Sequence, residues 1–139
     1  MLDRSTDEII TICKNAIPDY EKAVKQTRFF FGLLGRPGDG IGEFKIILDK
    51  VKKYEPNQAI YEIYSFHLGQ DFTSRLRIFI QIALFEIFHI ENNVELTMFG
   101  PKEGTILPGD LLDQKMTLIM HELGLADERD ELLPSVSTY

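Results

Sequence analysis

The sequence contains only one cysteine, Cys13, among its 139 residues. A single thiol cannot form a disulfide within the chain, and a zinc site would have to be built without a pair of cysteines. The fold therefore depends on its hydrophobic core. A chain of this length buries roughly two thirds of the surface that it exposes when unfolded, which suffices for one domain. No internal repeat is visible, and we expect a single helical domain over 1–139 with a polar tail at 134–139.

The sequence also lacks an excess of basic residues. Aspartate and glutamate number 22 against 15 lysines and arginines, giving a formal charge of −7 and an isoelectric point near 4.9. Because neutralisation of phosphates supplies much of the affinity of nucleic-acid binders, this balance argues against DNA or RNA as a partner. An acidic surface favours a basic protein partner, and it also keeps a small domain soluble.

A long apolar run free of charges is missing as well. The segment 72–90 reads FTSRLRIFIQIALFEIFHI, and Arg75, Arg77 and Glu86 interrupt it. A charge at the centre of a bilayer costs about 2.5 to 3.5 kcal/mol, so we expect no membrane span. The first ten residues, MLDRSTDEII, do not place a basic region before an apolar run, as a secretion signal would. We therefore expect a cytoplasmic protein.

The same segment, 72–90, is the most informative feature of the chain. Apolar residues occupy nearly every helical angle across its length, and neither glycine nor proline interrupts it. A helix that is hydrophobic all round belongs in the interior of a fold. The segment therefore predicts an all-α, single-domain bundle of about six helices packed around a central hydrophobic helix at 72–90.

The surrounding helices are predicted from apolar residues at helical spacing. Ser5 and Glu8 form a capping box that begins the first helix. Pro18 interrupts the pattern that follows, and the sequence leaves open whether 6–34 is two helices or one kinked helix. The further helices are expected at 43–54, 57–68 and 110–123, and Gly124 is placed to end the last of them.

The longest irregular region lies between residues 92 and 109. It contains two prolines and three glycines, which disfavour regular structure, and loops of this length are often functional. Its segment 94–99 reads VELTMF and resembles a strand. We therefore allow for a short antiparallel β pair near 93–107.

The loop 35–42 reads GRPGDGIG, and glycines of this kind let backbone N–H groups approach a phosphate. A P-loop requires Gly-Lys-Ser/Thr at its end, whereas Ile41 follows Gly40 here, and a helix rather than a strand precedes the loop. The loop is interpreted as a helix cap and connector. The alternative is that Arg36 and Asp39 contact a ligand or a partner.

The three histidines, His67, His89 and His121, are expected on different helices. His121 and Glu122 begin like a zinc-protease motif, but Leu125 occupies the position of the second histidine. We therefore expect no metal site and no cofactor.

Polar residues of the expected central helix form a candidate site. Arg75, Glu86 and His89 fall within roughly 60 degrees of arc on a helical wheel, where they could line a cleft as a binding group, an acid and a base. The alternative interpretation is that this arc is where the helix reaches water. No nucleophile or oxyanion donor is visible beside these residues, so the sequence does not predict a specific enzyme.

In size, acidity and helical content the chain resembles the immunity factors and secretion chaperones of bacteria, which implies a function in protein–protein binding. Its C-terminal segment 126–133, ADERDELL, is similar to the glutamate-rich signal of type IV secretion effectors, which implies delivery to a host cell. Three hypotheses therefore stand: a protein-binding module, a delivered effector, and a small enzyme with a cleft beside the central helix.

Overall fold

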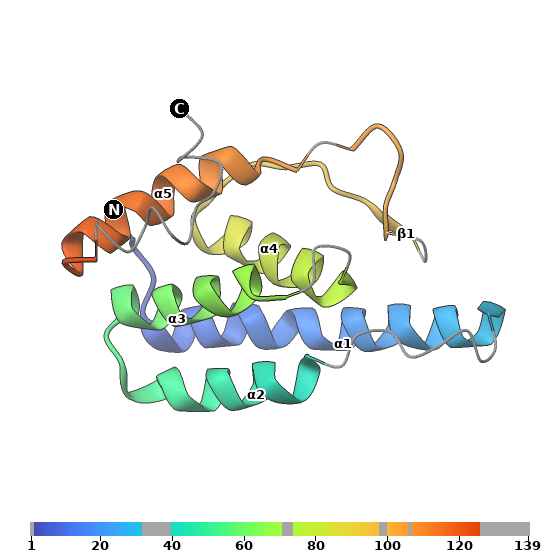
Figure 1. The fold of residues 1–139 in the computed structure, drawn as a ribbon, viewed down its shortest axis with the longest axis horizontal. Helices are drawn as coiled ribbons and strands as arrows, with labels where there is room; N and C mark the ends of the chain where they lie inside the picture. The colour runs from blue at the N-terminus through green and yellow to red at the C-terminus, as the bar shows by residue number, and fades with distance from the viewer. Residues whose placement is uncertain (1, 32–39, 71–73, 98–99, 106, 126–139) are drawn as a thin grey trace.

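The computed structural model describes residues 2–31, 40–70, 74–97, 100–105 and 107–125. Within these residues the chain forms five α-helices, one short 3-10 turn and one pair of two-residue strands (Figure 1). In chain order the elements are α1 (Thr6–Phe31), α2 (Ile41–Lys50), η1 (Val51–Lys53), α3 (Pro56–Leu68), α4 (Arg75–Ile87), β1 (Leu96–Thr97), β2 (Gly100–Pro101) and α5 (Gly109–Glu122). The predicted all-α class is confirmed, but the helices number five rather than about six.

The difference in number comes from α1, which is one continuous helix of 26 residues. Its start is the predicted capping box: the Ser5 N–H donates to Glu8 Oε1 at 2.9 Å, and the Glu8 N–H donates to Ser5 Oγ at 3.1 Å. Pro18 lies inside the helix without ending it. Pro18 and Lys14 are both exposed, so the Lys14 carbonyl that loses its helical partner belongs to the solvent side of α1.

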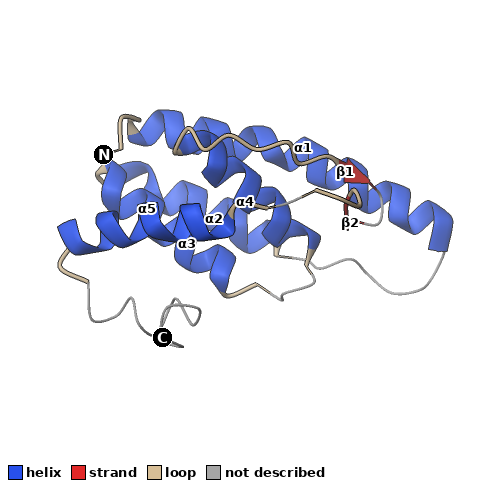
Figure 2. Cartoon of the chain, turned by 90° about the horizontal axis from the view of Figure 1, so that it is seen from above, coloured by secondary structure: helices blue, strands red, loops and turns tan. Residues whose placement is uncertain are grey.

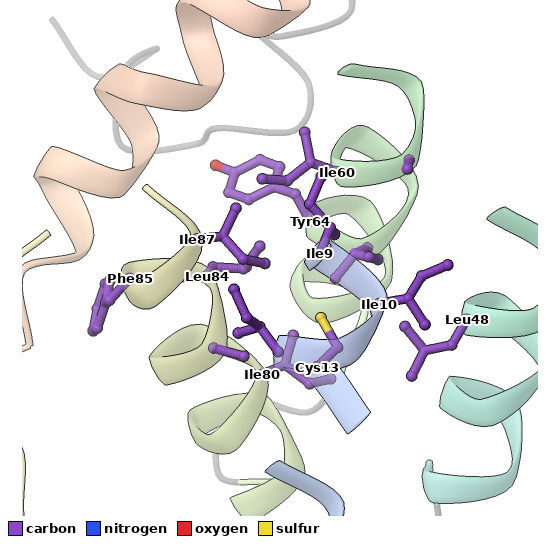
Figure 3. Close-up of a cluster of buried hydrophobic side chains, with 14 of the residues drawn as sticks. Ile9, Ile10, Cys13, Leu48, Ile60, Tyr64, Ile80, Leu84, Phe85 and Ile87 are labelled. Atoms are coloured by element: carbon purple, nitrogen blue, oxygen red, sulfur yellow. The ribbon is translucent and has the colours of Figure 1, made fainter. Parts of the chain in front are cut away.

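The core is shared by α1, α3 and α4, whose facing side chains meet in one cluster (Figure 3). Helix α2 and η1 cover one side of this cluster, and α5 covers another (Figure 1). The fully buried large side chains come from all five helices: Ile9, Phe44, Leu48, Ile60, Ile63, Tyr64, Leu76, Ile80, Leu84, Phe85, Ile87 and Leu112. The segment expected at 43–54 is α2 followed by η1, and it buries Phe44, Leu48 and Val51 as an amphipathic helix should.

The expectation of an enclosed central helix over 72–90 is not shown. Helix α4 spans 13 residues, Arg75–Ile87, and 71–73 lie outside the described residues. It packs against α1, α3 and α5, but Glu86 is exposed and Ile82 only partly buried. A continuous apolar pattern indicates that a helix is buried, yet it does not require other elements to cover every side of it. One side of α4 borders a groove between α1 and α4.

The segment between α4 and α5 contains the antiparallel pair that the sequence allowed. Leu96 pairs with Pro101 and Thr97 with Gly100. Figure 2 shows these strands on the side of α1. Helix α5 ends as predicted at Gly124, which has a φ of 76°. No helix in the described ranges is both long and apolar enough to span a bilayer.

Candidate functional site

The structure does not bring together the three sequence-predicted site residues that it describes, Arg75, Glu86 and His89. Arg36 and Asp39 lie outside the described residues, and their suggested role stays a prediction. Arg75 begins α4, and Glu86 lies near its end, about 16 Å further along the helix axis. His89 lies beyond α4 altogether. Glu86 and His89 line different hollows of the surface, and Arg75 lines neither of them.

The larger of these hollows is a groove between α1 and α4. It has a volume of about 520 Å³ and is also bordered by Val94, in the segment that leaves α4. We call it the α1–α4 groove and define it by its lining residues: Ile12, Asn15, Ala16, Asp19, Lys22, Ala23, Phe79, Ile82, Ala83, Glu86 and Val94. Its volume is in the range of pockets that bind ligands.

Each wall of the groove is one face of a helix. The lining positions on α1 are 12, 15, 16, 19, 22 and 23, and those on α4 are 79, 82, 83 and 86, so each set repeats every three or four residues. Alanine occupies three of the facing positions: Ala16, Ala23 and Ala83. Because alanine carries only a methyl group, these positions leave space that longer side chains would fill. The groove is therefore a result of residue size along two facing helices.

The two helices run antiparallel, which fixes the ends of the groove. Tyr20 of α1 contacts Phe79 near the start of α4, with ring centroids 5.9 Å apart. Near the end of α4, the Glu86 carboxylate is close enough to Cys13 of α1 to raise the pKa of its thiol, although burial is the larger cause. Figure 1 shows the same antiparallel course of α1 and α4. Asp19 and Glu86 therefore lie on opposite walls, toward opposite ends of the groove.

The floor of the groove is apolar and its rim is polar. Ile12, Phe79 and Ala83 are buried, whereas Asn15, Asp19, Lys22 and Glu86 are exposed. In the described part of the chain, the side chains of Asp19, Lys22 and Glu86 have no hydrogen-bond or ion-pair partner. Some exposed carboxylates outside the groove, such as Glu21 and Glu91, are likewise unpaired in the described ranges, whereas Glu8, Asp49, Glu62 and Glu95 each lie in an ion pair with a basic residue. The rim of the groove thus presents charges that the fold itself does not use.

His89 has a structural position that the sequence analysis did not anticipate. It has a φ of 57°, and it ends α4 in the arrangement usual for glycine: the His89 N–H donates to the Glu86 carbonyl and the Ile90 N–H donates to the Phe85 carbonyl. Its Nε2 lies 2.9 Å from Asp3 Oδ1, and the pKa of Asp3 is lowered mainly by this hydrogen bond. His89 is therefore not on the helical arc of Arg75 and Glu86, which corrects the predicted stripe.

The residues before α1 attach to this end of α4. Arg4 Nη2 donates to the Glu86 carbonyl at 3.0 Å, and Arg4 Nε donates to the Ile87 carbonyl at 3.4 Å. The last carbonyls of a helix have no hydrogen-bond donor within the helix, and they carry partial negative charge. A guanidinium supplies them with both N–H donors and a positive charge. The chain start therefore stabilises the helix that carries one wall of the groove.

A second hollow of about 360 Å³ lies beside α5. It is lined by Leu2, Asp3, Ile87, Phe88, His89, Lys115, Leu118, Ile119, His121 and Glu122. Leu118 is 59% exposed at its edge. The polar groups here are of both signs, and two of them, Asp3 and His89, already pair with each other. This hollow is therefore a weaker candidate for a binding site than the α1–α4 groove.

A buried polar cluster joins α3 to α5. The Tyr64 hydroxyl donates to Asp113 Oδ1 at 2.6 Å, and the His67 Nδ1–H donates to the Tyr64 carbonyl at 2.8 Å. Burial raises the pKa of both Tyr64 and Asp113, and it lowers the pKa of His67 to about 4. The bond between Tyr64 and Asp113 ties α3 to α5, and none of the three side chains lines either hollow described above.

The described residues contain no group of three or more histidine, cysteine, aspartate or glutamate side chains placed to hold a metal ion. Cys13 is completely buried in the core (Figure 3). A thiolate is the reactive form of cysteine, and a pKa raised to about 12 keeps Cys13 protonated.

The sequence analysis missed the groove, although a signal for it was present. Positions 12, 16, 19 and 23 of α1 already follow helical spacing, and they place two alanines and an aspartate on the same face as Ile12. That pattern became invisible once Pro18 was treated as a possible break between two helices.

Comparison with protein families, with curated protein sequences and with solved structures finds no match for this chain.

Proposed function

We propose that the protein acts by binding another protein, and that the α1–α4 groove is the binding site. The observation that carries this proposal is the groove itself, with its apolar floor and its unpaired charged rim. A buried apolar centre surrounded by a polar rim is the usual anatomy of a protein-binding surface.

The small-enzyme hypothesis receives less support. Glu86 and His89 line different hollows among those that the described residues form, and Arg75 lines neither, whereas a general acid and base must both reach the same reacting group. The effector hypothesis concerns 126–133, outside the described residues, and stays a prediction. The likeness to bacterial immunity factors or secretion chaperones is consistent with a binding function, and a cytoplasmic location stays a prediction as well.

Site-specific crosslinking in cells of the source organism tests the proposal. A photoreactive amino acid at Asn15, on the rim of the groove, should yield a covalent adduct with a partner protein. The same amino acid at Thr11, which is exposed on α1 but does not line the groove, should not. Mass spectrometry then identifies the partner.

A second substitution makes the test specific for the groove. Ala16→Phe places a large side chain in the hollow and should abolish the adduct formed from Asn15. Gly42→Phe is the matched control, because a Cβ at Gly42 would meet no atom within 4 Å. An adduct that persists in the Ala16→Phe variant, or that forms equally from Thr11, would show that the groove is not the binding site.

A further inference from the structure

The walls of the α1–α4 groove are two antiparallel helices, and this restricts the shape of what can fill it. A helix packs well into the depression between two others, since its side chains enter the spaces between theirs. The groove is shallowly filled where its lining residues are the alanines Ala16, Ala23 and Ala83. Their short side chains would let the backbone of a bound helix approach the backbones of α1 and α4 closely. The described residues that line the groove offer no sheet edge to which an extended peptide could add a strand.

The charges of the rim restrict the chemistry of the occupant. Asp19 on α1 and Glu86 on α4 are exposed and unpaired within the described chain, and they flank the apolar floor from opposite sides. Lys22 is a single positive charge at the end occupied by Asp19. The net charge of the rim is negative, as is that of the whole protein at −7. Both favour a positively charged occupant.

The spacing of the two carboxylates predicts how far apart the basic residues of the occupant lie. Glu86 is near Cys13, and Asp19 is six residues further along α1, which corresponds to about 9 Å along the helix axis. In a bound helix, two basic residues six positions apart would span this distance, and at 100° per residue they would point about 120° apart around the helix. They would lie on either side of the apolar stripe, because the carboxylates are on opposite walls.

We propose that the occupant of the groove is an amphipathic α-helix of a partner protein, with an apolar stripe flanked on either side by basic residues about six positions apart. This inference rests on the proposed function, since it assigns a partner class to the same groove. The apolar stripe enters the floor between Ile12 and Phe79, while the basic groups meet Asp19 and Glu86.

Two synthetic peptides of roughly 15 residues test this assignment, a length near the lower limit for an isolated helix. Both carry leucines at helical spacing. One has lysines six positions apart, one on each side of the leucine stripe, and its twin has glutamates at the same positions. Binding to the full chain is followed by fluorescence anisotropy. The lysine peptide is expected to bind at least about tenfold more tightly than the glutamate peptide, and raising the salt concentration should reduce the difference.

Charge reversal locates the interaction. The double variant D19K/E86K should weaken binding of the lysine peptide about tenfold or more and strengthen binding of the glutamate twin, since each exposed pair contributes modestly and reversal adds repulsion. The control E21K/E91K makes the same change in net charge at exposed positions outside the groove and should leave both affinities within about twofold. Circular dichroism confirms that both variants keep their helices.

Several results would overturn the assignment: equal binding of the two peptides, equal effects of the two double variants, or no binding of either peptide. If neither peptide binds while the adduct from Asn15 still depends on an open groove, the helical partner is wrong and the proposed binding function stands. If that adduct is also absent, both fail.

Discussion

The Tyr64 hydroxyl donates a 2.6 Å hydrogen bond to Oδ1 of Asp113, and this bond joins α3 to α5 across 49 positions of sequence. Tyr64 is completely buried, and Asp113 is partly buried. A buried hydroxyl without a hydrogen-bond partner would destabilise the fold. The bond therefore favours the position of α5 in which Asp113 lies against Tyr64. Figure 3 shows the Tyr64 oxygen directed toward α5.

Replacing Tyr64 by phenylalanine removes this bond while keeping the ring in the core. We expect Y64F to lower the free energy of unfolding by about 1 to 3 kcal/mol, because Asp113 remains partly buried without its donor. Urea denaturation measures the change. The control is Y54F, since Tyr54 is only partly buried and no side-chain hydrogen bond of it is found in the described chain. Equal stability losses in the two variants would contradict the role assigned to the bond.

His67 should make stability depend on pH. Burial lowers its pKa from 6.5 to about 4, with the positive charge of Arg77 adding to the effect and the bond to the Tyr64 carbonyl opposing it. Between these two pKa values the unfolded chain binds more protons than the folded one. The free energy of unfolding should therefore rise from about pH 4 to about pH 6.5, by at most about 1.4 kcal/mol per pH unit, and level off above.

The contribution of His67 is isolated by comparing variants. Asp113 opposes it, because burial raises the pKa of that carboxyl and its protonation favours the fold. H67M should flatten the profile between pH 4 and 6.5 relative to the original protein, and H121M, the same substitution at an exposed position, is the matched control. Urea titrations at several pH values measure both profiles. An unaltered slope in H67M would mean that His67 is not neutral and buried in solution.

The left-handed backbone of His89 predicts a stabilising substitution. A residue with a side chain loses about 1 kcal/mol in this conformation relative to glycine. We expect H89G to be neutral or up to about 1 kcal/mol more stable, since the exposed contact with Asp3 contributes little. Thermal unfolding measures the change. The same logic predicts that G124A destabilises by a similar amount, because Gly124 has a φ of 76°. Marked destabilisation by H89G would instead show that its side chain is essential.

The rate at which the Cys13 thiol is modified should report how often the core opens. Its thiol is completely buried, and its pKa is raised to about 12, chiefly by burial. A thiol reagent such as DTNB should therefore modify the folded protein at pH 8 only as fast as the core opens. In urea the reaction should be complete within the mixing time of a bench assay. Rapid reaction of the folded protein would contradict the burial of α1 against α3 and α4.

The sequence predicted elements whose signals are local. The capping box of Ser5 and Glu8 and the end of α5 at Gly124 each depend on a few neighbouring residues, and both were correct. A helix within 72–90 was also predicted and is found at 75–87, whereas the enclosure predicted for it is not shown. Periodicity reports how apolar a helix is, whereas the neighbours that cover it are set by contacts with distant segments.

The groove and the end of α4 show the same limit. The groove depends on Ala16 and Ala83 facing each other across 67 positions, and no pattern within either helix fixes that register. His89 was included in the helix because the apolar residues Phe88 and Ile90 continue the pattern on both sides. Its left-handed conformation is one that histidine adopts more often than most residues with a side chain.

The antiparallel pairing of α1 with α4 has a consequence for synthesis of the chain. Helix α1 is translated first, yet the surface that covers its apolar face, residues 75–87, follows more than 40 residues later. At about 5 to 20 residues per second, a ribosome leaves α1 without this partner for several seconds. Nascent chains stalled before residue 75 should therefore engage chaperones through α1, and chains extended past α4 should not.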